Sequence, residues 1–97
     1  MRTKVQVEAQ VENFVKSLAP APRKRLTRAI KTLVNDHGDV RRLEGKIEGY
    51  SRSRVAGYRV LLTERSSAGQ RIIGCVYAEK RPIVYELFIR LLSESLE

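Results

Sequence analysis

The hydrophobic residues change their spacing near residue 49, and this change limits what the chain can fold into. Upstream, apolar residues at i, i+3, i+4 and i+7 mark one face of a helix; they are Val11, Phe14, Val15 and Leu18. Downstream, residues 50–55 alternate with the two-residue period of a strand. A helical segment followed by successive strands is typical of an α+β domain, in which helices cover an antiparallel sheet.

The N-terminal half predicts a short strand and then a pair of helices. Residues 3–7 alternate and form the strand. Residues 19–22 end the first helix because proline lacks an amide donor, and Pro22 suits the first turn of the next helix. The inward face of this second helix comprises Leu26, Ala29, Ile30, Leu33 and Val34. Residues 36–39 then end it in a loop, where His37 is expected to be solvated.

The C-terminal half predicts a three-stranded antiparallel meander followed by a short helix. The strands are expected at 50–55, 58–62 and 71–77, with turns at 56–57 and 66–69 and the helix over 83–92. The predicted fold class is α+β: an N-terminal strand, a two-helix hairpin, the meander and a short C-terminal helix, with the helices packed on one face of the sheet. The 97 residues are expected to form a single domain, 1–97.

The formal net charge of +8 favours a polyanionic partner, and nucleic acid is the usual one. An acidic protein partner and a merely soluble surface both stay open. One cysteine and one histidine exclude an internal disulfide and a Cys/His zinc site, so neither a metal nor another cofactor is expected. Cys75 lies in an apolar run and is predicted to be buried. Because neither a membrane-spanning run nor a signal-like N-terminus is visible, we expect a cytoplasmic protein without a membrane partner.

Cations are concentrated between residues 41 and 59, and they are the strongest candidates for a functional site. Arg52 and Arg54 fall on one face of a strand, about 6–7 Å apart, which resembles the spacing of successive phosphates. Tyr50 shares that face and offers a ring for base stacking, while Lys46 precedes it as a further RNA contact. Arg59 follows the tight turn and is expected to join the same patch. The alternative is an ordinary solvated strand surface.

A second group of candidates follows the last expected strand, where a rigid sheet commonly presents functional groups. It consists of Lys80 and Arg81, with Tyr85 at the start of the closing helix. In the alternative interpretation Tyr85 belongs to the core, and the two cations are only solvated loop residues.

These motifs together resemble the RelE/ParE toxins. The resemblance lies in Leu43-Glu44-Gly45, in residues 50–60 with their alternating strand, turn and Tyr-Arg-hydrophobic strand, and in Glu79-Lys80-Arg81 with Val84-Tyr85. It covers nearly the whole chain, and its short motifs are specific only jointly. It implies a toxin of a type II toxin–antitoxin system, with a cognate antitoxin as partner and no small-molecule substrate. In the RelE branch it implies a metal-independent, ribosome-dependent mRNA endoribonuclease that inhibits translation.

In that branch the family's basic residues match Arg52, Arg54, Arg59 and Arg81, and its terminal tyrosine matches Tyr85. Cleavage would proceed by attack of the RNA 2′-hydroxyl on the adjacent phosphorus. We expect Arg59 and Arg81 to stabilise the charged transition state, and Lys80 or Tyr85 to transfer protons. The sequence lacks the Glu/His acid–base pair of some relatives. On this assignment Arg59→Ala and Arg81→Ala fold normally but lose growth inhibition.

Two other functions stay open at this stage. A ParE-like protein inhibits DNA gyrase by protein–protein contact and catalyses nothing. A catalytically inactive module of the same fold only binds nucleic acid, with an affinity that falls as salt rises. The antitoxin is expected to fold either across the helical hairpin or beside the sheet, and the sequence does not choose between them.

Overall fold

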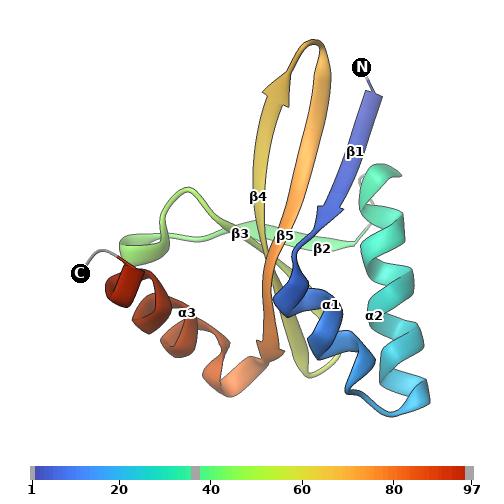
Figure 1. Cartoon of the computed structure of the whole chain (residues 1–97), viewed down its shortest axis with the longest axis vertical. Helices are drawn as coiled ribbons and strands as arrows, with labels where there is room; N and C mark the ends of the chain where they lie inside the picture. The colour runs from blue at the N-terminus through green and yellow to red at the C-terminus, as the bar shows by residue number, and fades with distance from the viewer. Residues whose placement is uncertain (1, 36–37, 96–97) are drawn as a thin grey trace.

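The structure is a computed structural model and describes residues 2–35 and 38–95. Its elements are β1 (Arg2–Val7), α1 (Ala9–Lys16), α2 (Pro20–Thr32), the 3₁₀ turn η1 (Leu33–Asn35), β2 (Asp39–Arg42), the 3₁₀ turn η2 (Gly45–Ile47), β3 (Ser51–Val55), β4 (Tyr58–Ser67), β5 (Gln70–Lys80) and α3 (Arg81–Ser95). The predicted α+β class and the order of strand, two helices, meander and helix are confirmed (Figure 1). The expected loop residue His37 lies outside the described residues.

The strands form one open sheet in the order β1-β5-β4-β3-β2. The predicted meander is present, since β3 pairs with β4 and β4 with β5, both antiparallel, while β1 lies parallel to β5. The sequence pattern did not predict β2, which adds an edge strand next to β3. Val40 is the one apolar residue in Asp39–Arg42, and it is itself 44% exposed. The strand therefore has no buried face, and its sequence lacks the alternation of apolar and polar residues by which a strand is predicted.

The helices cover both faces of the sheet, which corrects the prediction that they share one. Helices α1 and α2 pack with Val60 and Leu62 of β4 through Val11 and Leu26. Helix α3 packs through Val84 and Phe88 against Leu61 and the turn η2, on the opposite side (Figure 1). Neighbouring strand residues point to opposite faces, so the consecutive buried residues Val60, Leu61 and Leu62 already required cover on both sides.

The hairpin of β4 and β5 is longer than expected and extends past β3 (Figure 1). Pairing with β3 ends at Leu62, whereas pairing with β5 continues to Ser67. The hairpin turns at Ala68 and Gly69, whose φ values of 50° and 76° are both positive. A two-residue turn with this geometry matches the twist of the strands, which explains why the strand continues through residues expected to lie in a loop.

The side chain of Gln10 fixes helix α1 against β5. The amide nitrogen of Gln10 donates to the carbonyl of Ala78, and its oxygen accepts from the amide of Ala78, both at 2.8 Å. Because β1 pairs with β5 only as far as Cys75, this side chain takes the place of a neighbouring strand farther along. Among residues 2–35 and 38–95, no helix is long and apolar enough to cross a membrane.

Candidate nucleic-acid interface

Three of the predicted site residues lie together on the α3 side of the sheet, and we call Arg52, Arg54 and Arg59 the arginine face. Arg54 is the cross-strand partner of Arg59, and Arg52 is the partner of Leu61. Since Leu61 packs in the α3 core, all of these side chains leave the sheet on that side. The three arginines therefore share one side of the sheet, as the strand period predicted, and a common role in binding RNA stays a prediction.

The carboxylate of Asp39 holds the two arginines of β3, a feature that sequence reasoning missed. Arg54 Nη2 lies 2.5 Å from Asp39 Oδ2, and Arg52 Nη1 lies 3.2 Å from Asp39 Oδ1. The hydrogen bond from Arg52, aided by the charges of Arg54 and Arg41, lowers the pKa of Asp39. Asp39 sits on the unpredicted strand β2 opposite Arg54, so only the register reveals the pair. The Arg52 side chain is 12% exposed and that of Arg54 is 56% exposed, so Arg54 is the accessible member.

Arg59 has a structural role in the hairpin between β3 and β4. It is only 6% exposed, and its Nη1 donates to the carbonyls of Ala56 at 3.1 Å and of Tyr58 at 2.8 Å. Ala56 occupies the turn with a φ of 53°, a conformation that needs support in a residue with a Cβ. Arg59 therefore holds the turn, and its replacement by alanine is no longer expected to leave folding unaffected.

Arg81 adjoins the same turn, whereas Lys80 faces the other way. The backbone amide of Arg81 donates to the carbonyl of Gly57 at 2.8 Å, which sets the exposed Arg81 beside the hairpin. There is no loop here, because β5 ends at Lys80 and α3 begins at Arg81. Lys80 is the cross-strand partner of Tyr58, which packs toward α1 and α2, so the structure does not bring Lys80 to the arginine face.

Tyr50, predicted to stack on RNA bases, and Tyr85, predicted to transfer protons, both pack in the α3 core. The Tyr50 ring meets Phe88 edge-on, with ring centroids 4.9 Å apart at 85°. Tyr85 is half-buried against the same core, as the alternative interpretation proposed. Lys46 is exposed in η2 beside Leu92 and Ser95 at the far end of α3. Helix α3 has 15 residues and is therefore about 20 Å long, so Lys46 and Arg81 lie at opposite ends.

A carboxylate that the sequence did not single out lies next to the arginines. Glu79 is the cross-strand partner of Arg59 and shares its side of the sheet. One of its oxygens accepts a hydrogen bond from the Lys80 amide at 3.0 Å. Burial, together with the charge of Glu79, raises the pKa of the neighbouring Tyr77. Among the described residues, no group of His, Cys, Asp or Glu is arranged to hold a metal ion.

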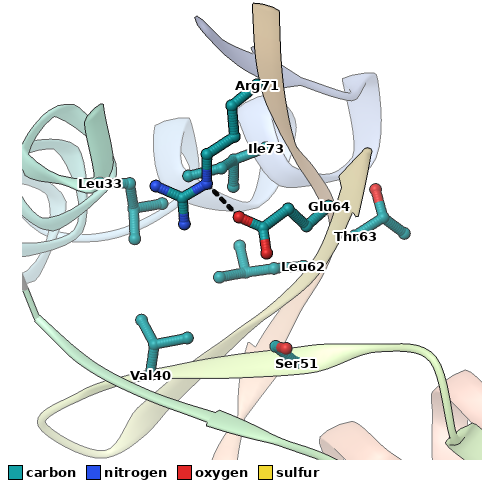
Figure 2. A pocket seen from close by; sticks show the side chains of 8 residues that line it. All are labelled: Leu33, Val40, Ser51, Leu62, Thr63, Glu64, Arg71 and Ile73. Atoms are coloured by element: carbon teal, nitrogen blue, oxygen red, sulfur yellow. Dashed lines mark hydrogen bonds and ion pairs between the residues drawn. The ribbon is translucent and has the colours of Figure 1, made fainter. Parts of the chain in front are cut away.

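A small cavity of about 90 Å³ lies on the other face of the sheet. It is lined by Leu33, Val40, Ser51, Leu62, Thr63, Glu64, Arg71 and Ile73 (Figure 2). The guanidinium of Arg71 is paired with the carboxylate of Glu64, and both residues line the cavity. Leu62 and Ile73 belong to the core beneath α1 and α2, so this cavity is separated from the arginine face by the sheet.

The sequence matches no family model and no curated protein, but the fold is similar to that of several solved structures. The YoeB/ParE toxin from Agrobacterium tumefaciens aligns over 80% of this chain and 98% of its own, at a TM-score of 0.62 and 15% identity. A chain of the RelBE2 toxin–antitoxin complex from Mycobacterium tuberculosis aligns over 84% and 93%, at a TM-score of 0.65 and 13% identity. A chain of the RelB–RelE complex from Methanococcus jannaschii aligns over 86% and 98%, at a TM-score of 0.59 and 19% identity.

The chain has a RelE/ParE-like fold. The short motifs on which the resemblance was based occupy β3, the hairpin turn, β4 and the junction of β5 with α3. In this RelE/ParE-like fold, those segments carry the arginine face, Glu79 and Arg81. The sequence resemblance and the structural similarity therefore agree on the fold, although at 13–19% identity the similarity covers the fold alone.

Proposed function

We propose that this chain is the toxin component of a type II toxin–antitoxin system and that it cleaves mRNA on the ribosome. The observation that carries the proposal is the grouping of cations at one end of the sheet. Arg54 and Arg59 are cross-strand partners, and Arg81 is tied by its backbone to the turn that joins their strands. A formal charge of +8 favours approach to RNA. The similar structures include a toxin and two toxin–antitoxin complexes.

In the proposed reaction, the RNA 2′-oxygen forms a bond to phosphorus as the bond from phosphorus to the 5′-oxygen breaks. The products are a 2′,3′-cyclic phosphate and a 5′-hydroxyl end. The exposed guanidinium groups of Arg54 and Arg81 bind the phosphate and its developing charge, because they match two oxygens and stay ionised. Arg52 positions Asp39 and Arg54, and Arg59 supports the turn beside the reacting group.

The proton transfers require a base and an acid near these arginines. We assign Glu79 as the acceptor of the 2′-hydroxyl proton, since it lies opposite Arg59 on the same face. A proton must also reach the 5′-oxygen as it leaves. In this proposal, Tyr85 or a group of the ribosome supplies that proton. Lys80 lies on the α1 and α2 side of the sheet, so its side chain would have to reach around the sheet edge to donate.

Induced expression in a bacterial host tests the proposal. We expect new mRNA 5′ ends confined to translated regions, and we expect both Arg54→Gln/Arg81→Gln and Glu79→Gln to remove them without loss of folding. Two controls remove the same kinds of charge elsewhere: Lys24→Gln/Arg28→Gln on the exposed side of α2, and Glu86→Gln on α3. Unchanged cleavage in Arg54→Gln/Arg81→Gln would reject the assignment.

Inhibition of DNA gyrase by protein contact is the second candidate, and the burial of Arg52 and Arg59 favours it. Arg59 is committed to backbone carbonyls and Arg52 to Asp39, which leaves Arg54 and Arg81 as the exposed arginines of the proposed site. In the same expression experiment, a reporter plasmid would then lose negative supercoiling before translation falls. Loss of supercoiling without new mRNA ends would replace the nuclease proposal.

For the antitoxin, we propose the groove between α1 and α2. The groove has a volume of about 410 Å³, and its apolar floor includes Val7, Val15 and Ile30. Its lining also includes Arg23 and Lys31, while Lys16 is paired with Glu12, so its net charge is positive and it suits an acidic amphipathic helix. A variant of the exposed groove residue, Lys31→Glu, should remain toxic but resist neutralisation by a co-expressed antitoxin, whereas continued neutralisation would favour docking beside the sheet.

A further inference from the structure

The part of the sheet beyond α3 presents a face whose residues form three rows across β1, β5 and β4. The register gives the rows as Arg2–Gln70–Ser67, Lys4–Ile72–Arg65 and Gln6–Gly74–Thr63. These residues point away from α1 and α2, because their neighbours Val5, Ile73 and Leu62 pack in the core beneath those helices. We call these nine residues the row face.

The row face is cationic and open. Arg2, Lys4 and Arg65 are exposed, and none of its nine residues is acidic. The residues of β4 and β5 that α3 contacts are Leu61, Val76 and Tyr77, which lie beyond the Gln6–Gly74–Thr63 row. The helix therefore borders the row face and leaves it uncovered.

The cations of the row face are held by the sheet rather than scattered on loops. Arg65 Nη2 lies 3.3 Å from the Oε1 of Gln6, so the Arg65 side chain reaches across the central strand toward β1. Gly74 lies in that central strand beside Gln6 and Thr63, and its lack of a side chain keeps the surface low. Ile72 lies between Lys4 and Arg65 and is only 7% exposed, in keeping with cover by their aliphatic stems.

We propose that the row face is a second RNA-backbone contact, separate from the arginine face. Arg2 and Lys4 are two residues apart on one strand, about 6–7 Å, and Arg65 lies two strands away, about 10 Å from them. Such spacings suit consecutive phosphates of a bent or structured RNA. Uncharged Gln and Ser side chains between the cations donate to phosphate and sugar oxygens without reading bases.

The two surfaces lie on the same side of the sheet, with α3 between them. Arg59 and Arg65 are six residues apart on β4, which corresponds to about 20 Å along the strand. RNA held at the row face would thus be anchored several nucleotides from the arginine face. This inference rests on the proposed function in taking RNA as the polyanion, but it needs no catalysis.

The test is the salt dependence of binding of the purified chain to labelled oligouridylate of about 20 nucleotides. Each phosphate contact to a single strand contributes about 0.7 to the slope of log affinity against log salt. We expect Arg2→Gln/Lys4→Gln/Arg65→Gln to lower the slope by about 2. The matched control Lys24→Gln/Arg25→Gln/Arg28→Gln removes equal charge from the exposed side of α2 and is expected to change the slope by less than about 0.7.

A charge-preserving variant, Arg2→Lys/Arg65→Lys, tests whether a lower slope comes from lost charge or from altered folding. It should keep the slope of the unaltered chain, and loss of the slope here would overturn the charge argument. Equal losses in the row-face and α2 variants, or no loss in the row-face variant, would also overturn the inference. If the row-face loss is seen but the unaltered chain cuts no mRNA in cells, the inference stands and the nuclease proposal fails.

Discussion

One guanidinium nitrogen of Arg52 donates to both the backbone carbonyl and the carboxylate of Asp39, at 2.9 and 3.2 Å. This contact fastens the edge strand β2 to β3 through side chains as well as through the ladder. Because Arg54 binds the other carboxylate oxygen, one acidic residue holds both arginines of β3.

The contact between Arg52 and Asp39 predicts that the stability of the fold depends on pH. The pKa of Asp39 is lowered in the folded chain, chiefly by the hydrogen bond from Arg52. The stabilisation is therefore complete above the unfolded pKa of about 4 and is lost as pH falls through the lower folded value. In urea, Asp39→Asn should unfold more easily than the unaltered chain at about pH 6, and the difference should shrink as pH falls below about 4. The control Glu94→Gln should show no such convergence, and a pH-independent difference for Asp39→Asn would contradict the argument.

Replacing Arg59 should lower the stability of the fold much more than replacing Arg81. Arg59→Ala removes charge-assisted hydrogen bonds to two turn carbonyls and is expected to lower the free energy of unfolding by about 2 kcal/mol. The exposed Arg81→Ala should change it by less than about 0.5 kcal/mol. Urea denaturation of both variants makes the comparison. Equal, small effects would mean that Arg59 does not hold the turn.

Gly74 should not tolerate a side chain while Thr63 keeps its hydroxyl. A Cβ at Gly74 would lie 2.6 Å from Thr63 Oγ1, closer than atoms can approach. We expect Gly74→Ala to cost about 1–3 kcal/mol of stability and Thr63→Ala/Gly74→Ala to recover much of it. A double-mutant cycle by urea denaturation measures the coupling, and additive effects would argue against the contact.

Replacing Ala68 with glycine should stabilise the folded chain. Its φ of 50° lies in the left-handed region, which costs a residue with a Cβ about 1 kcal/mol. Ala68→Gly is therefore expected to raise the melting temperature, although the greater freedom of glycine in the unfolded chain offsets part of the gain. Ser66→Gly, in the regular part of β4, should lower it. A lower melting temperature for Ala68→Gly would refute the turn geometry.

The thiol of Cys75 should be unreactive in the folded chain. It is fully buried, and burial raises the pKa of its thiol to about 11. The thiolate fraction near pH 8 is then about a hundredfold or more below that of an ordinary thiol. A thiol-specific reagent should label the chain only as fast as it unfolds, with rapid labelling in urea. Fast labelling of the native chain would show that the β5 core opens locally.

The periodicity of the chain was sufficient to predict most of the fold. The stripe from Val11 to Leu18, the prolines at 20 and 22 and the alternation after residue 49 fix helix, break and strand through local steric and burial rules. The convergence of Arg52, Arg54 and Arg59 also followed from the two-residue period and a short turn. Each of these properties depends on near neighbours in the chain.

Tertiary structure decided what those residues touch. The strand β2 exists because β3 supplies its hydrogen-bond partners, and only that pairing brings Asp39 to Arg52 and Arg54. The burial of Arg59, the position of α3 on the second face and the rows that align Lys4 with Arg65 depend on registers between distant segments. A sequence pattern reports which side of an element is apolar, but the free energy that selects a register is shared among all the strands it joins.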